Sequence, residues 1–402
     1  FLPFFVTPVI SKSVPTTTYK EVLPLMTTSA PAKARLYFLD NLRSFIILLV
    51  IAFHVSLGYM FPPLEWWYVI DIKQSLFFTA FVMLVDVFIM PTMFLIAGYF
   101  TVPVLQRGSV SAFFRNKINR IVLPWIAGVL LLAPAITYMI WFSRSATPPA
   151  YLFFWQTMFF TPKIFNQAHY WFLGLLFYFY LLAVSLYRFR PALLRAKAQP
   201  TDPTVPLFLG FGAITATTFW LATLVAPADL WFNQLYVIAF QPSRLLLYLA
   251  YFLLGIHAWR NAWFTAAGYR PSLRQWSLIT LLFAVIFLLY RLSFPVPPTS
   301  LLKAGHAVLH SFFCLGMVFT LLAFFQHKMN GSGYLWRRLS LTSYTIYYIH
   351  QAVVLPVAYA AQKLDMAIAA KYLLVSAVCL LATYLTAEII IRIKSLCSTK
   401  LG

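Results

Sequence analysis

The sequence predicts an all-α integral membrane bundle of about ten transmembrane helices, and its composition, apolar runs and charge placement support this. Of the 402 residues, 62% are hydrophobic and 10% are charged, whereas soluble domains average roughly 45–50% and 25%. So small a charged fraction could not cover the surface of a soluble protein. Aromatic residues reach 19%, which suits the two interfaces of a membrane.

Apolar runs of about 20 residues, the length that spans a bilayer, define the predicted helices. We place them at 42–60, 76–100, 121–141, 169–187, 206–226, 243–259, 276–293, 305–326, 341–360 and 371–391. Pro91 predicts a kink or break in the second run. The apolar stretch 151–160 is too short to span and predicts an interfacial or re-entrant helix. We expect an extended, cytoplasmic N-terminal tail over 1–34, a transmembrane domain over 35–395 and a cytoplasmic C-terminal tail over 396–402.

Lysine and arginine alternate between the predicted loops, and those on one side outnumber those on the other by about three to one. The positive-inside rule therefore predicts that both termini are cytoplasmic. The net charge of +21 does not indicate nucleic-acid binding, because the basic residues form short clusters between apolar runs. Cys314, Cys379 and Cys397 are too scattered to predict a disulfide or zinc framework.

The first predicted span contains the motif LDNLRSFIILLVIAFH, which ends at His54. Arg43 precedes His54 by 11 residues, which is about 20° beyond three helical turns, so both lie on one helix face roughly 16 Å apart. An ionisable group at this depth needs a partner or a polar cavity. The residues alone leave two interpretations open, a neutral histidine bonded to a neighbouring helix and a general base that faces a cavity.

Several motifs, in this order, resemble the acyltransferase-3 family of integral membrane acyltransferases. Arg43, ten residues and His54 match its Arg-x10-His signature, and residues 35–60 resemble the branch that includes the periplasmic-glucan succinyltransferases. The other similar segments are MFLIAGYF (93–100), FFRNKINRIVLP (113–124), HYWFLG (169–174), YLAYFLLGI (248–256) and LTSYTIYYIHQAVV (341–354). Lys117 departs from the pattern, since the family's basic loop has an arginine there.

The resemblance implies an O-acyltransferase of the bacterial inner membrane. Such an enzyme moves an acetyl- or succinyl-type group from cytoplasmic acyl-CoA to a hydroxyl of an extracytoplasmic glycan, with acyl-CoA as a substrate and no bound cofactor or metal. His54 would be the catalytic base, with a covalent acyl-histidine as the alternative. The residues expected to bind the phosphates of acyl-CoA are Arg43, Arg115, Lys117 and Arg120.

Other polar residues are expected to line the cavity or the acceptor side. These are His169, Trp171, His350, Tyr347, Asp86 and Glu388. Trp171 could equally anchor its helix at the membrane interface, and one of the two acids could orient a histidine. Arg244 could pair with a sugar or a carboxylated acyl group, or extend toward the interface. His306 and His310, four residues apart, have metal-ligand spacing, although hydrogen bonding within the bundle is the simpler interpretation.

Two other functions remain compatible with the residues. A secondary transporter or flippase would use the buried histidines as proton relays, and broken helices in matched halves would favour it; only Pro91 suggests such a break. A non-catalytic membrane subunit of a larger complex would keep the same fold. Consumption of an acyl-CoA thioester that depends on His54 separates an acyltransferase from both.

Overall fold

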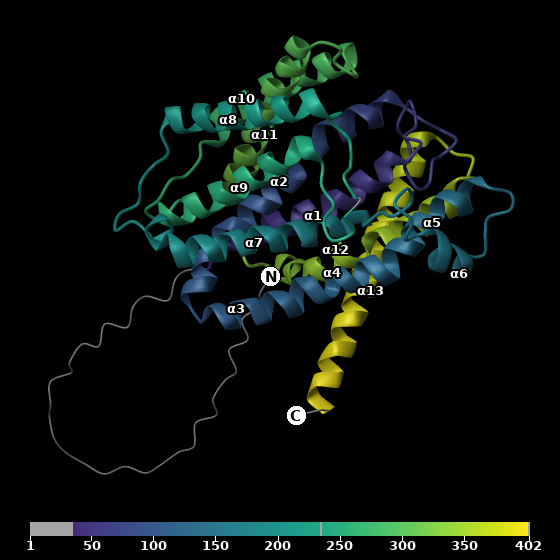
Figure 1. Ribbon diagram of the computed structural model, residues 1–402, viewed down its shortest axis with the longest axis horizontal. Helices are drawn as coiled ribbons and strands as arrows, with labels where there is room; N and C mark the ends of the chain where they lie inside the picture. Colours follow the sequence, from purple (N-terminus) through teal and green to yellow (C-terminus); the bar gives the residue numbers. More distant parts are fainter. Residues whose placement is uncertain (1–34, 234, 401–402) are drawn as a thin grey trace.

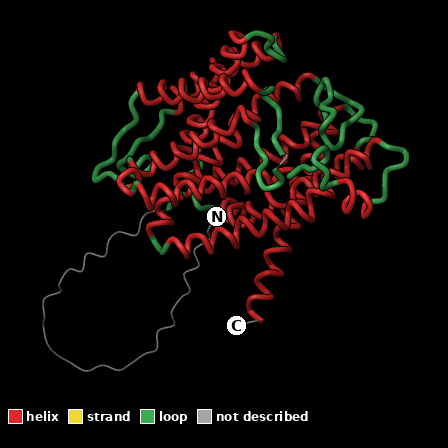
Figure 2. Tube along the Cα trace, viewed as in Figure 1, coloured by secondary structure: helices red, strands yellow, loops and turns green. Residues whose placement is uncertain are grey.

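The computed structural model describes residues 35–233 and 235–400, and this part of the chain is a bundle of helices joined by loops (Figures 1 and 2). No β-strand occurs in the described ranges, which contain only two isolated bridges. The predicted all-α class is therefore confirmed. The tail predicted over 1–34 lies outside the described residues.

Each of the ten predicted spans coincides with helix in the structure. The helices are α1 (Tyr37–Leu57), α2 (Leu76–Gln106), the segment Val110–Arg144, α7 (Trp171–Phe189), α8 (Val205–Val225), α9 (Pro242–Arg260), α10 (Leu273–Ser293), α11 (Ser300–Lys328), α12 (Tyr334–Ala361) and α13 (Ile368–Lys400). Among the described residues, eight of these segments are long and apolar enough to cross a membrane. The other two, α9 and α12, carry several basic residues and histidines.

The segment Val110–Arg144 is helical throughout but changes its helical type. It comprises α3 (Val110–Lys117), α4 (Leu123–Ala127) and α5 (Ala133–Arg144), which are joined by the π-helical turns Ile118–Val122 and Gly128–Leu132. The short helix predicted over 151–160 is present as α6 (Tyr151–Phe153) and a π-helical turn at Phe154–Met158.

A kink or break was predicted at Pro91; helix α2 continues through this residue, so the break does not occur. Proline has no N–H, and the carbonyl of Val87, four residues earlier, loses its usual helical donor. The thiol of Cys314 on α11 donates to this carbonyl at 3.3 Å. A neighbouring helix thus satisfies the freed backbone oxygen, which allows proline inside a membrane helix.

Helices α2 and α9 run side by side at very close range, and two glycines permit this. A Cβ atom on Gly98 would lie 1.9 Å from the carbonyl oxygen of Phe252, and one on Gly255 would lie 2.0 Å from that of Leu95. Small residues at such positions let backbones approach where lipid supplies no hydrophobic driving force.

Helix α1 lies inside the bundle and defines its two ends. Arg43 lies near the first residue of α1 and His54 near the last, so we refer to the Arg43 end and the His54 end of the bundle. The loop 58–75 covers the His54 end. The last turns of α13 extend away from the bundle (Figure 1), and residues 392–397 are exposed. Helix α13 reaches Lys400, beyond the predicted domain boundary at 395.

We predict that Gly98→Ala destabilises the protein by about 1–3 kcal/mol, the usual cost of overpacking, because the added methyl group meets backbone rather than a movable side chain. Thermal unfolding in detergent measures this effect. Gly210→Ala on α8 is the matched control, since a Cβ there has no neighbour within 4 Å. Equal melting temperatures for the two variants would contradict the packing described.

Candidate active site

Three histidines from separate parts of the sequence meet at the His54 end. His54 comes from α1, His350 from α12 and His169 from a 3₁₀ turn (Ala168–Tyr170) that precedes α7. The Nδ1 atom of His54 lies 3.0 Å from Nε2 of His350. The rings of His169 and His350 have their centroids 4.4 Å apart. The structure therefore brings together three residues that the sequence indicated only one by one.

The hydrogen bonds of His350 and His54 indicate which nitrogen of each of these two rings carries the proton. His350 Nδ1 lies 2.6 Å from the carbonyl oxygen of Tyr347, and a carbonyl oxygen only accepts, so this nitrogen is the donor. In a neutral His350, Nε2 is then the acceptor, and His54 Nδ1 donates to it. The Nε2 atom of His54 consequently holds a lone pair, which is the state that a general base requires.

His169 is held by the turn of α12 that carries His350. Its Nδ1 lies 3.0 Å from the side-chain oxygen of Gln351, and its Nε2 lies 3.2 Å from the carbonyl oxygen of Tyr348. The Tyr347 hydroxyl donates to the carbonyl oxygen of His169 at 2.5 Å. Predicted residues His169, His350 and Tyr347 thus belong to one network around His54.

The loop 58–75 closes over His54 from the end of the bundle. The indole of Trp67 stacks on the imidazole of His54, with ring centroids 5.5 Å apart and an interplanar angle of 6°. Beside them lies a cavity of about 10 Å³, whose lining includes His54, Trp67 and Asp71. This volume corresponds to about one water molecule.

Side chains from two other helices hold this loop in place. Arg144 of α5 donates to the carbonyl oxygens of Glu65 and Trp67. Lys371 of α13 forms a buried ion pair with Asp71 at 2.7 Å. Asp71 is therefore engaged in fixing the loop.

A second and much larger cavity opens at the Arg43 end. Its volume is about 640 Å³. Its charged lining residues are Arg35, Asp40, Arg43, Arg107, Lys117 and Lys197. Five cations against one carboxylate make this cavity suited to an anionic ligand that carries phosphate groups.

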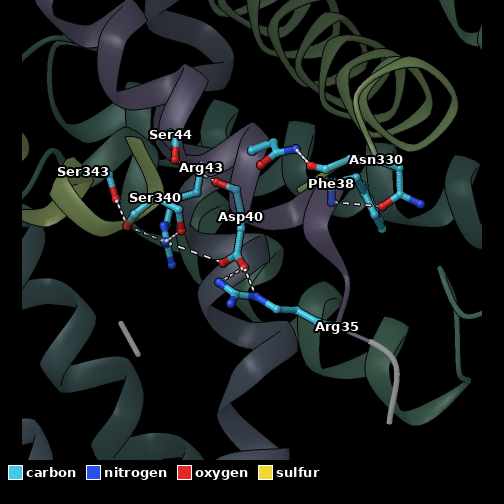
Figure 3. A network of polar contacts seen from close by, with 10 residues as sticks. Arg35, Phe38, Asp40, Arg43, Ser44, Asn330, Ser340 and Ser343 are labelled. Carbon is cyan, nitrogen blue, oxygen red and sulfur yellow. Dashed lines mark hydrogen bonds and ion pairs between the residues drawn. The ribbon is translucent and has the colours of Figure 1, made fainter. Parts of the chain in front are cut away.

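Arg43 lines this cavity, and Figure 3 shows the polar contacts that hold its side chain. Its Nη2 atom donates to the Ser340 hydroxyl of α12 at 3.1 Å and lies 3.5 Å from Asp40. Asp40 also pairs with Arg35 at 2.8 Å. Lys117 is buried, and its ammonium lies 4.0 Å from the ring centroid of Tyr180, a cation–π contact.

Two of the four residues predicted to bind the phosphates of acyl-CoA line this cavity, and two do not. Arg43 and Lys117 line the large cavity, whereas Arg115 and Arg120 are exposed and are absent from its lining. The change to π-helical geometry at Ile118 alters the faces on which the following residues lie. Arg107 and Lys197 line the cavity and were missed. Both residues lie in basic loops that the charge bias assigns to the same side of the membrane as Arg43, and this could have indicated them.

Neither predicted acid orients a histidine. Asp86 of α2 pairs with Arg244 of α9 at 2.6 Å. Glu388 of α13 pairs with Arg338 and accepts from the Tyr384 hydroxyl at 2.8 Å. Along α13, Glu388 is roughly 25 Å from Lys371 at the His54 end, so the structure does not bring Glu388 together with the histidines.

His306 and His310 of α11 pack against aromatic rings. The Phe219 ring lies 5.5 Å from His306 and 4.6 Å from His310. Within the described ranges, no three or more His, Cys, Asp and Glu side chains are arranged so that they could hold a metal ion. Trp171 lies next to Tyr248, with centroids 5.7 Å apart.

The two cavities have no lining residue in common. The roughly 16 Å of α1 between Arg43 and His54 separates them. One face of α12 runs alongside this segment and carries Ser340, Ser343, Tyr347 and His350 at helical spacing. A polar stripe therefore connects the basic cavity to the histidine cluster.

Comparison with known proteins identifies the family. The family model described as an acyltransferase domain, that of the acyltransferase-3 family, matches residues 36–390. Glucans biosynthesis protein C of Salmonella gallinarum is 26% identical over 260 residues, which cover 61% of this chain and 63% of that protein. The protein of the same name from Shigella dysenteriae is 26% identical over 239 residues, 55% of this chain and 57% of that protein.

A shorter match, to glucans biosynthesis protein C of Escherichia coli K12, is 33% identical over 98 residues, 24% of this chain and 25% of that protein. The matched part thus spans less than two thirds of the length of each of these relatives. The family model, in contrast, covers most of the chain and includes Arg43, His54, Lys117, His169 and His350. The chain belongs to the acyltransferase-3 family of integral membrane acyltransferases.

Proposed function

We propose that this protein transfers an acyl group, of the acetyl or succinyl type, from acyl-CoA to a hydroxyl of a glycan. The Arg43 end would face the bacterial cytoplasm and bind the donor, and the His54 end would face outward and receive the acceptor. This proposal rests on the two hydrogen bonds that link the Tyr347 carbonyl oxygen, His350 and His54. His54 lies on the same face of α1 as Arg43, which lines the basic cavity.

The donor would place its nucleotide phosphates against Arg43 and Lys117 in the large cavity. Its pantetheine arm would follow the polar stripe of α12, past Ser343 and Tyr347, to bring the thioester to His54. Because the two cavities are separate in this conformation, binding of the donor must part α1 and α12 along this stripe.

At the histidine cluster, Nε2 of His54 would remove the proton from the acceptor hydroxyl as its oxygen attacks the thioester carbonyl. The new C–O ester bond forms, the C–S bond breaks, and the proton passes from His54 to the departing thiolate, which leaves as free CoA. His350 would accept the Nδ1–H of His54 throughout and stabilise the imidazolium form. A glycan acceptor is supported by the names of the curated relatives, each a glucans biosynthesis protein.

We predict that His54→Ala lowers acyl transfer by about 10²–10⁴-fold, the usual contribution of a general base, with CoA affinity unchanged. His350→Ala should lower kcat without raising KM for the donor, and His350→Gln should recover part of the loss because its amide oxygen can accept from His54 Nδ1. Transfer of radiolabelled acyl groups by purified protein measures both effects.

His327→Ala is the control for these variants, since this exposed histidine at the end of α11 lies 3.3 Å from the Pro271 carbonyl oxygen and does not belong to the histidine cluster. Near-normal transfer by His54→Ala would remove His54 from catalysis. Absence of any thioester consumption by the wild-type protein would instead favour a transporter or a non-catalytic subunit.

Lys117 and Arg115 offer a second, matched test because they lie two residues apart and only Lys117 lines the basic cavity. We predict that Lys117→Met weakens acyl-CoA binding by about tenfold or more, as expected for the loss of a charged hydrogen-bond donor. Arg115→Met should bind the donor normally. Calorimetric titration with acyl-CoA distinguishes the two, and equal losses would contradict the assignment of the cavity to the donor.

A further inference from the structure

A cluster of charged and aromatic side chains takes no part in the chemistry proposed above. It is built from Asp86 on α2, Arg244 near the start of α9, and Asp229 in the loop between α8 and α9. Arg244 Nη2 lies 2.6 Å from Asp86 Oδ2 and 3.5 Å from Asp229 Oδ1. One guanidinium thus joins a transmembrane helix to a loop.

The exposure of these groups indicates an opening to water. The Asp86 side chain is 34% exposed although α2 is a membrane-spanning helix, and that of Asp229 is 68% exposed. A charged group within a span faces the bundle interior or an aqueous cavity, because contact with lipid costs several kcal/mol. The exposed part of Asp86 therefore faces water that reaches into the bundle from the loop.

The guanidinium of Arg244 keeps an unused donor. Arg244 is itself 8% exposed, and its Nε atom is buried without any hydrogen-bond partner. Buried donors in native proteins are nearly always satisfied, so this N–H points to a ligand or to water that occupies the site. The carboxylates of Asp86 and Asp229 supply acceptors at the same place.

Two tryptophans form the aromatic wall next to these charges. Trp231 lies two residues after Asp229, and its ring centroid is 5.2 Å from that of Trp171. Trp171 stacks on Tyr248, one helical turn after Arg244, with an interplanar angle of 24°. Trp171 also follows His169 by two residues, which connects this wall to the histidine cluster. Both tryptophans are partly exposed.

The charges at the site balance, which favours a neutral ligand. Asp86 and Asp229 carry two negative charges, and Arg244 together with Arg291, which interacts electrostatically with all three, carries two positive charges. A ligand with a carboxylate or phosphate group would be repelled by the two carboxylates that the site already contains. A sugar ring matches the site better, since its hydroxyl groups both donate and accept and its C–H face packs on indole.

We propose that Asp229, Trp231 and the Asp86–Arg244 pair form a subsite that binds a neutral sugar unit of the acceptor. This inference rests on the proposed function and deepens it, because it assigns a binding place to a sugar next to the one acylated at His54. A glycan held here would extend from the histidine cluster along Trp171 to the loop between α8 and α9.

The test is calorimetric titration of the purified full-length protein with a short linear glucan oligosaccharide in the absence of acyl-CoA. Asp229→Asn and Trp231→Ala should each weaken binding roughly threefold to tenfold, which is the range for one aromatic contact or hydrogen bond. Asp202→Asn and Trp155→Ala are the controls, since they alter an exposed acid and a partly exposed tryptophan elsewhere, and both should bind as the wild type does.

Three results would overturn the subsite: no oligosaccharide binding by the wild type, equal affinity of the site variants and controls, or displacement of the oligosaccharide by succinate. The proposed function is judged separately by donor consumption that depends on His54. If that consumption persists while the site variants bind normally, only the subsite fails. If it is absent, the acyl-transfer proposal fails while the binding result still stands.

Discussion

The hydrogen bond from His350 to the carbonyl oxygen of Tyr347 is the constraint on which the candidate active site depends. A backbone carbonyl cannot donate, so it dictates the tautomer of His350 and, through the 3.0 Å contact between the rings, that of His54. The side chain of His54 is also confined by the stacked indole of Trp67. A neutral imidazole with one fixed donor and one fixed lone pair is thereby held near the end of a membrane helix.

The rest of the fold places this imidazole in relation to the basic cavity. Helix α1 carries Arg43 and His54 on one face, and α12 provides a partner to each, Ser340 to Arg43 and His350 to His54. The ion pair between Lys371 and Asp71 fixes the loop that covers the histidines. The same two helices therefore link a site suited to phosphate groups with a site suited to proton transfer.

Much of this could be predicted from the sequence. Apolar run length located all ten helices, and the spacing of Arg43 and His54 placed them on one face. The meeting of His169 with His350 depends on how distant helices pack, which periodicity does not encode. Arg115 and Arg120 were assigned to the donor site from the resemblance to the family's basic loop. Of the three basic residues in that segment only Lys117 lines the cavity, and the π-helical turns that follow it are not visible in the sequence pattern. Glu388 was identified as a buried acid, and only the structure reveals Arg338 as its partner.

In the proposed mechanism, a donor held at the Arg43 end reaches His54 through the interior of the bundle. An experimental structure of the protein with a non-hydrolysable acyl-CoA analogue would test this path. We expect the nucleotide to lie against Arg43 and Lys117 and the thioester mimic to lie within hydrogen-bonding reach of His54 Nε2, with the arm between α1 and α12. An analogue whose acyl end stays in the basic cavity, or that binds elsewhere, would contradict it.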